Sequence, residues 1–288
     1  MRVFPRVLHI LIQGRQLRGV AALCERKGLY VNIPRYFWII STYLFFTAAF
    51  AAPQITSADR AAVTQCISAS HDRNACVGIV ADACIKNAIS RDSYVEDAKA
   101  CAARELGVWD ERLQASLKIV NESFPALLPA IADVQSNWLK SRDGLCPGFD
   151  NIDPGMYLGE SDYCRLKETG RRALIIECMS LPRDKNGSAE TCIGSLAGRC
   201  ELAKGEDAKA CALRELTDSK KRLQATVQHL GNIREVQSYW LKSREQLCPL
   251  FAVIDPGMDR VGSNRCRQVE TTGRAEILEK LAATVEEH

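Results

Sequence analysis

Apolar residues recur at helical spacing in two neighbouring stretches of the chain. They step by three or four residues from Val95 to Val120, and a second stripe with the same spacing runs from Leu127 to Leu145. Such spacing gathers apolar side chains on one face of a helix. Pro125 and Pro129 fall where the stripes meet and predict a turn, because proline is poorly tolerated inside a helix. The sequence has no long alternating run of β-branched residues, so we expect an all-α protein built from helical hairpins.

A second pair of apolar stripes follows the first. It runs from Ala208 to Leu230 and from Ile233 to Leu247, with Gly231 and Asn232 at the turn. The sequence itself repeats as well: EDAKACAARELG at 96–107 returns at 206–217 as EDAKACALRELT, and VQSNWLKSRDGLC at 134–146 returns at 236–248 as VQSYWLKSREQLC. Two tandem copies of one module of roughly 110 residues explain this pattern.

The two copies differ in the length of the hairpin. Their offset is 110 residues at Cys101 and Cys211 but 102 residues at Gln135 and Gln237, so the second copy lacks eight residues between its stripes. Removing about four residues, one turn, from each helix keeps both apolar faces in register. We therefore expect the hairpin of the first module to be about one turn longer.

The boundary between the modules falls in a segment that fits both of them. Residues 171–180 align with the start of the first module at Arg60 and with the end of the second module at Arg274. One helix over 171–180 is therefore expected to close the first module, 52–180, and to open the second, 171–288. The alternative is two modules joined flexibly.

Residues 1–51 differ from the rest of the chain and are expected to form an N-terminal extension with a secretory signal. Residues 36–49 carry no charge, Arg35 precedes them, and Ala49 and Ala51 are small residues before a cut after Ala51. A basic flank, an apolar core and small residues at the exit are typical of a signal peptide, here about 31–51. The alternative is an uncleaved helix that anchors the protein, since the apolar stretch is just long enough to span a bilayer. Cleavage is the preferred interpretation, and it places the protein in the periplasm or outside the cell.

Charge and residue type exclude several classes of function. Residues 1–51 contain seven Lys or Arg and one Glu, which leaves the remaining chain with 31 basic and 34 acidic residues and a net charge of −3. An acidic chain gives no electrostatic reason to expect a nucleic-acid partner. The sequence has no GxSxG, HExxH or P-loop motif, and its few histidines do not recur between the copies. We therefore predict a protein that is not an enzyme and that uses no cofactor and no metal.

Twelve cysteines follow the signal segment, six in each module, and predict disulfides in an oxidising compartment. Their spacings are unlike the close pairs of zinc sites. Six cysteines allow 15 pairings per module, and the sequence does not choose among them. The preferred pairs join neighbours along the chain: Cys146–Cys164 and Cys248–Cys266, which close a loop between helices; Cys84–Cys101 and Cys200–Cys211, which tie the entry segment to the long helix; and Cys66–Cys76 and Cys178–Cys192, by elimination.

A recurrent motif precedes the loop cysteine: Gln135, Trp138 and Arg142 in the first copy, and Gln237, Trp240 and Arg244 in the second. The spacing of Trp138, Arg142 and Cys146 puts them on one helical face. One interpretation makes Trp and Arg a platform for a ligand. We favour the other, in which Trp fills the core and Arg caps carboxylates and carbonyls of the loop, because both copies retain the set together with the cysteine.

The combined pattern resembles the LprI-like lysozyme-inhibitor N-terminal domain family. Its elements in the first copy are Cys84, Cys101-Ala102, Asp110-x-x-Leu113-Gln114, the set Gln135, Trp138, Arg142 and Cys146, then Cys164 and the stretch from Arg172 to Glu177. The pattern occurs twice and covers nearly all of the chain after residue 52. The family usually has Gly-Gly in the loop where this chain has Pro154-Gly155 and Pro256-Gly257, and the second copy has Lys220 in place of Asp110. The resemblance implies an extracytoplasmic helical protein and, for a few members, inhibition of lysozyme.

Two surfaces are candidate contacts for a protein partner. The loop 147–163 contains Asp150, Asp153, Glu160 and Asp162 and no Lys or Arg. Closure by a disulfide would preorganise this acidic loop, which would then attract a basic protein such as a lysozyme. Phe124 lies near the longer hairpin tip and is the second candidate. The alternatives are a solvated loop whose acids cap helices, and a tip that packs against the other module.

The expected function is that of an exported inhibitor that binds lysozyme or another basic cell-wall-degrading enzyme. The alternative is a binding or scaffold module for another partner in the cell envelope, without lysozyme inhibition. The sequence leaves the partner and the oligomeric state open.

We predict that the exported protein begins at Ala52 and carries six disulfides. Intact-mass spectrometry with and without reductant measures the start of the chain and the number of bridges together. A mass that retains residues 31–51 would favour the anchor helix instead.

Overall fold

The computed structural model describes residues 54–89, 94–151, 160–181, 188–196, 205–231, 233–254 and 259–286. Residues 52–288 form one compact unit. The predicted signal segment and its cleavage site after Ala51 lie outside the described residues. Across the described residues the regular elements are helices, with no strand, which confirms the predicted all-α class. None of the described helices is long and apolar enough to cross a membrane.

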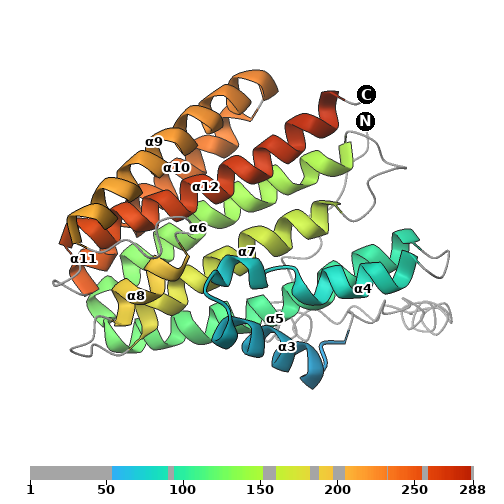
Figure 1. Ribbon diagram of the computed structural model, residues 1–288, viewed down its shortest axis with the longest axis horizontal. Coiled ribbons are helices and arrows are strands. Elements are labelled where there is room, and N and C mark those ends of the chain that lie inside the picture. Colours follow the sequence, from blue (N-terminus) through green and yellow to red (C-terminus); the bar gives the residue numbers. More distant parts are fainter. Residues whose placement is uncertain are drawn as a thin grey trace, which may run out of the picture. The chain divides into compact units, whose positions relative to one another are not determined.

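The helices follow one another in two similar series (Figure 1). Up to residue 180 the elements are α3 (Ser57–Ala69), η1 (Arg73–Cys76), α4 (Ile79–Ile89), α5 (Tyr94–Ser123), η2 (Pro125–Leu127), α6 (Leu128–Leu145), η3 (Cys146–Asn151) and α7 (Glu160–Ser180). Beyond it they are α8 (Ser188–Ser195), α9 (Gly205–Leu230), α10 (Arg234–Leu247), α11 (Leu250–Ile254) and α12 (Asp259–Glu286).

Local signals explain where several of these helices begin and end. Thr56 and Asp59 form a capping box at the start of α3, in which each side chain accepts a hydrogen bond from the other residue's backbone N–H. Pro125 and Pro129 lie in the first turns of η2 and α6, where a helix needs no backbone donor. Gly231 follows α9 with a φ of 60°, a conformation that costs glycine little.

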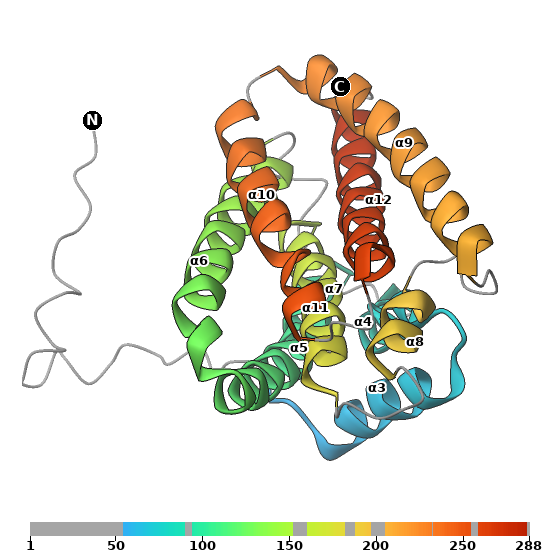
Figure 2. The same ribbon diagram turned by 90° about the vertical axis from the view of Figure 1, so that its left-hand side faces the viewer.

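Helices at equivalent positions of the two series pack in an equivalent way. The α5 helix packs along α7, α9 packs along α12, and α6 packs against α10 (Figure 2). In the first hairpin α5 has 30 residues and α6 has 18, whereas α9 has 26 and α10 has 14. Each helix of the first hairpin is thus four residues longer, about one turn. This difference confirms the extra turn that the sequence predicts for each helix, although α5 packs along α7 and α6 against α10, and not along each other as the two arms of a hairpin.

Disulfides tie neighbouring elements of the bundle together. The bridges Cys66–Cys76, Cys84–Cys101, Cys146–Cys164, Cys178–Cys192 and Cys248–Cys266 are present, with Cα–Cα distances between 5.4 and 5.7 Å. These five are the predicted pairs. Cys211 is also disulfide-bonded, and its predicted partner Cys200 lies outside the described residues. Each bridge is expected to stabilise the fold by about 2–4 kcal/mol.

One helix carries bridges from both sequence repeats. The α7 helix runs without a break from Glu160 to Ser180. Near its start Cys164 bonds to Cys146, and near its end Cys178 bonds to Cys192 in α8. This is the arrangement expected if residues 171–180 close one module and open the next.

The two halves also share their apolar cores. Val120 and Ile131, from the first hairpin, belong to one buried cluster with Leu247 and Phe251 from the second half. A second cluster joins Phe149 and neighbouring residues of the first half to apolar residues of the second, namely Leu223, Trp240, Leu278 and Leu281. Each half therefore packs its disulfide-closed turn against the other half.

Two reciprocal ion pairs cross between the halves in the protein interior. Arg172 donates through Nη1 to Glu270 Oε1 at 3.0 Å, and Arg274 donates through Nη1 to Glu168 Oε1 at 3.2 Å. Both arginine side chains are at most 1% exposed. Arg274 lies 102 residues after Arg172, and Glu270 lies 102 residues after Glu168. The two pairs are therefore copies of one another, related by a local two-fold exchange of the repeats.

Each buried guanidinium has further partners from both halves. Arg172 donates to Ser243 Oγ at 3.1 Å and to Gln135 Oε1 at 3.5 Å. Arg274 donates to Ser141 Oγ at 2.9 Å and to Gln237 Oε1 at 3.1 Å, which is the same set after exchange of the repeats. Desolvating two arginines is costly, and only such multiple hydrogen bonds offset that cost.

We predict that Arg172→Met destabilises the protein strongly, because it leaves the Glu270 carboxylate buried without its counter-charge. The expected loss is about 3–5 kcal/mol in the free energy of unfolding, measured by denaturant titration of residues 52–288. Arg172→Met combined with Glu270→Met should recover part of that loss.

The matched control is Lys118→Met, which removes a cation from an exposed pair with Glu122. Its expected effect is within about 1 kcal/mol. An equally small loss for Arg172→Met would contradict the importance of the buried pairs.

Candidate functional site

The recurrent Trp and Arg motif lies in the protein core. Trp138 is 3% exposed and Trp240 is 1% exposed. The Arg142 guanidinium lies 4.9 Å from the centroid of the Trp138 ring, and the Arg244 guanidinium lies 4.8 Å from that of Trp240. This geometry suits a cation–π contact within the core and leaves no aromatic face for a ligand.

The partners of these arginines differ in part from the sequence-based interpretation. We expected them to cap carboxylates and carbonyls of the loop that follows. Instead, Arg142 Nη1 donates to Thr169 Oγ1 at 3.0 Å, and Arg244 Nη1 donates to Thr271 Oγ1 at 2.9 Å. Each threonine lies on the long helix beyond the loop. The arginines therefore join two helices and fix how α6 packs on α7 and α10 on α12.

The predicted acidic contact residues are only partly brought together. Asp150 is exposed in η3, whereas Asp153 lies outside the described residues. Glu160 and Asp162 stand in the first turn of α7, where a carboxylate interacts favourably with the helix dipole. Glu160 accepts a hydrogen bond from Lys280, and Asp162 pairs with Arg165 at 3.0 Å. The charge at these two positions is thus balanced within the chain.

The hairpin tip is also partly engaged inside the protein. Phe124 and Leu127 are partly buried and pack against the larger core cluster. Leu128 is 44% exposed. Phe124 and Leu127 therefore contribute to the core, whereas Leu128 faces solvent.

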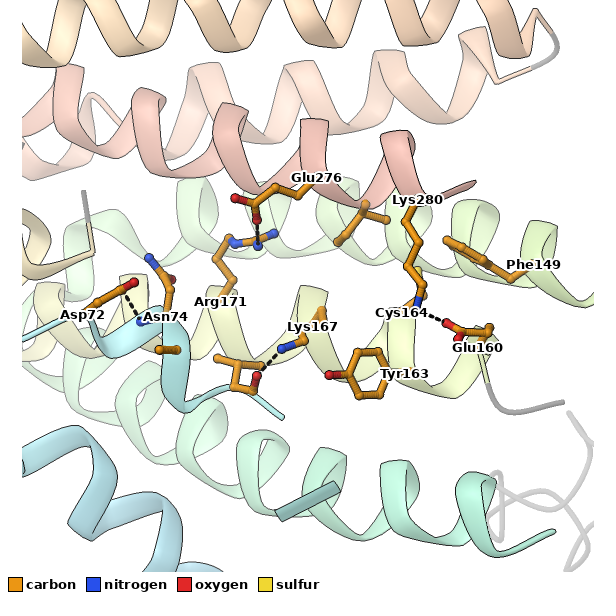
Figure 3. Close-up of a pocket in the computed structure, with 13 residues that line it drawn as sticks. Asp72, Asn74, Phe149, Glu160, Tyr163, Cys164, Lys167, Arg171, Glu276 and Lys280 are labelled. Carbon is orange, nitrogen blue, oxygen red and sulfur yellow. Dashed lines mark hydrogen bonds and ion pairs between the residues drawn. The ribbon is translucent and has the colours of Figure 1, made fainter. Parts of the chain in front are cut away.

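A cavity of about 330 Å³ lies between η1, α7 and α12 (Figure 3). Tyr163, Lys167 and Arg171 form the wall on α7, and Glu276 and Lys280 extend from α12 toward them. The remaining labelled side chains close its ends and sides: Asp72, Asn74, Phe149, Glu160 and Cys164. Sequence reasoning identified Glu160 in this set but not the cavity.

Burial shapes the electrostatics of the Tyr163 and Lys167 side chains. Burial raises the pKa of Tyr163, and its hydroxyl donates to Asp82 Oδ1 at 2.8 Å. Burial lowers the pKa of Lys167, whose ammonium donates to the Val77 carbonyl. The phenol therefore stays neutral at physiological pH and acts as a hydrogen-bond donor.

The backbone next to this pair requires a glycine. Gly78 has a φ of 108°, which side chains rarely allow. A Cβ atom there would also come within 2.8 Å of Lys167 Nζ and 2.9 Å of the Tyr163 hydroxyl. Gly78 thus lets the chain approach α7 closely.

Four of the six charged side chains that line the cavity are paired with one another. Arg171 binds Glu276 at 3.2 Å and Lys280 binds Glu160. The ammonium groups of Lys167 and Lys280 each lie 5.2 Å from the centroid of the Tyr163 ring. Among the described residues no group of three or more His, Cys, Asp or Glu side chains is placed to hold a metal ion. The arrangement suits binding and packing.

A pH prediction follows from Asp110, which Lys220 replaces in the second repeat. Burial raises the pKa of Asp110 above its usual value, and the attraction of Arg142 only partly opposes this. A carboxyl group whose pKa is raised on folding favours the folded state at low pH, and this contribution is lost as the pH rises through the folded pKa. Ionised Asp110 therefore opposes folding at neutral pH.

Asp110→Asn should raise the Tm by about 1–3 °C at pH 7, and the difference should shrink toward pH 3. Thermal unfolding followed by circular dichroism measures this, with the exposed Glu122→Gln as control. A lower Tm for Asp110→Asn at pH 7 would show that the Arg142 attraction dominates.

Comparison with known proteins identifies one region of the chain. Residues 84–174 match the model of the family described as Lysozyme inhibitor LprI. The matched region runs from α4 into α7 and contains two of the bridges and the set Gln135, Trp138 and Arg142. Neither the curated proteins nor the solved structures include a match to the chain. Residues 84–174 therefore form an LprI lysozyme-inhibitor domain.

Proposed function

We propose that this chain is an exported protein that binds lysozyme and inhibits it without catalysing a reaction. The LprI lysozyme-inhibitor domain at residues 84–174 is the observation that carries the proposal. That domain is part of a rigid bundle in which disulfides and a shared core hold the helices in place. A rigid surface loses little entropy when it binds, which favours inhibition by occlusion.

The proposed location is the periplasm or the extracellular space. Disulfides persist in oxidising compartments and are rare in the cytosol, and five bridges join described residues in this chain. The uncharged segment 36–49 and the small residues before Ala52 fit a signal peptide that is removed.

Residues 171–288 are proposed to be a second LprI-like module. The family match does not extend over them. Support comes from the repeated sequence, from the matching pairs α5 with α7 and α9 with α12, and from the paired contacts of Arg142 and Arg244. On this proposal the protein is a fused pair of modules, 52–180 and 171–288.

Electrostatic attraction would guide the encounter with a basic enzyme such as lysozyme. Residues 52–288 carry a net charge of −3, and complementary charge raises the rate of association. Within the acidic loop, Glu160 and Asp162 are already paired inside the chain. Asp150 and Asp153 are therefore the loop carboxylates proposed to face the partner.

The alternative function is a binding or scaffold module for another envelope protein. The same surfaces would serve it, and lysozyme would not bind. A pull-down from periplasmic extract, run beside a direct lysozyme-binding assay, separates the two functions.

The test uses purified residues 52–288 in an assay of cell-wall lysis by lysozyme. The wild-type protein should slow lysis in proportion to its concentration. Asp150→Lys with Asp153→Lys should weaken inhibition about tenfold at low salt, and the difference should shrink at high salt because exposed charges are screened.

The matched control is Glu122→Lys with Asp207→Lys, which changes the net charge equally at exposed positions away from the loop. A similar loss in the control would mean that net charge alone matters. Unchanged inhibition after reversal at Asp150 and Asp153 would remove the loop from the account, and no effect of the wild-type protein on lysis would refute the proposed function.

A further inference from the structure

A second cavity lies beside the first and is lined mainly by side chains of α9 and α12. Its volume is about 450 Å³, and Asp72, Asn74, Arg171 and Glu276 line both cavities. The ion pair between Arg171 and Glu276 thus stands at the junction between them (Figure 3). The second cavity extends from this pair to side chains of α9.

The cavity has a buried polar floor and an exposed charged rim. Ser219 and Gln268 are buried and form part of the floor. Ser219 Oγ lies 2.8 Å from Thr272 Oγ1. Asp218 and Arg222 stand at the rim, with side chains 70% and 47% exposed. A long side chain from outside can therefore reach a desolvated floor.

The cavity lies at a place where the two repeats differ in the size of their side chains. With the offset of 110 residues, Val108 and Trp109 of the first repeat correspond to Asp218 and Ser219 of the second. Val108 is 2% exposed and Trp109 is fully buried. Two large apolar side chains that fill the first repeat are thus replaced in the second by smaller polar ones.

The glutamate four residues before Trp109 and Ser219 has a different role in each repeat. Glu105 of the first repeat is fully buried, accepts from Trp109 Nε1 at 2.8 Å and accepts three backbone N–H groups at the start of α4. Its counterpart Glu215 is partly exposed and lines the cavity. The first repeat uses this carboxylate to hold α4, whereas the second presents it to open space.

The balance of charge in the cavity is negative. Four carboxylates line it and two arginines oppose them. Arg222 is turned away to Glu279, which does not line the cavity, and binds it through Nε at 2.7 Å. Arg171 is paired with Glu276. The carboxylates of Asp72, Glu215 and Asp218 are thus left without a matching number of cations from the cavity wall.

The contacts that Asp72 and Asp218 do make are weak for a charged group. Asp72 accepts a backbone N–H from Asn74 at 3.0 Å. Asp218 lies 3.8 Å from the ammonium of Lys221, and the two side chains are 70% and 76% exposed, so their attraction is screened by water. An incoming cation would therefore meet carboxylates that are free to turn toward it.

We propose that this cavity receives an arginine side chain of the basic protein partner. The inference rests on the proposed function, since it names a second place on this chain, besides Asp150 and Asp153, where lysozyme makes contact. A guanidinium donates five N–H bonds in a planar fork and can pair with two carboxylates at once. Arginines that enter such pockets carry a large share of the energy of protein interfaces.

The test compares two changes to the site in residues 52–288, one that removes its charge and one that fills its space. Glu215→Gln with Asp218→Asn removes the charge and keeps the shape. Asp218→Val with Ser219→Trp restores the residue pair of the first repeat and fills the space. Calorimetric titration with lysozyme should show binding at least about tenfold weaker for each double variant than for the wild-type protein.

The matched control is Glu122→Gln with Asp207→Asn, which changes the net charge by the same amount at exposed positions away from the cavity. It should bind within about twofold of the wild-type protein. Circular dichroism of each variant checks the fold, and the isosteric Glu215→Gln with Asp218→Asn decides the outcome if the tryptophan variant does not fold.

The possible results separate the cavity from the proposed function. Wild-type protein that binds lysozyme while the isosteric variant binds equally well would overturn the cavity as the contact site and leave the function intact. An equal loss in the control would also overturn it. Wild-type protein that does not bind lysozyme at all would overturn both.

Discussion

The buried pairs of Arg172 with Glu270 and Arg274 with Glu168 are the constraint on which the rest of the structure depends. Each pair takes its arginine from one sequence repeat and its glutamate from the other. A buried guanidinium without its carboxylate would be very costly, so α7 and α12 must lie side by side for either helix to be accommodated. The two copies of the repeat therefore fold as one bundle.

Equivalent positions of the two repeats also meet where α7 contacts α12. Arg171 corresponds to Gly273 at the offset of 102 residues, and a Cβ atom on Gly273 would come within 1.9 Å of the Arg171 guanidinium. Two arginines would collide there. The glycine lets one arginine cross the contact and reach Glu276, and so the groove between α7 and α12 is asymmetric even though the helices around it are similar.

Much of the fold was predictable because its causes are local in the sequence. Helical periodicity and Pro125 predicted α5, α6 and the turn between them, and the change of offset predicted that both helices are longer than their counterparts. Pairing each cysteine with its neighbour along the chain predicted the bridges. The role of Arg142 was predicted only in part, because its partner Thr169 lies on a helix beyond the loop.

The candidate sites were harder to predict because they depend on contacts between distant residues. From the sequence, Glu160 and Asp162 were candidate contacts for a partner, because the loop around them has no Lys or Arg. In the fold Glu160 pairs with Lys280, 120 residues away. The cavity at Ser219 has a signal in the sequence, the exchange of Trp109 for serine between otherwise similar repeats. That signal becomes meaningful only once the neighbouring helices are known to leave space at this position.

The most direct test of the central claim is whether the two repeats unfold together. Trp109 and Trp138 report on the first repeat and Trp240 on the second. One variant of residues 52–288 would keep Trp240 and carry phenylalanine at the other two positions, and a second would carry only Trp240→Phe. In each, tryptophan fluorescence and far-ultraviolet circular dichroism are followed through a denaturant titration. A bundle held by reciprocal buried pairs predicts the same midpoint for both signals within each variant. Fluorescence and circular dichroism transitions that separate, with one repeat losing its structure while the other stays folded, would contradict it.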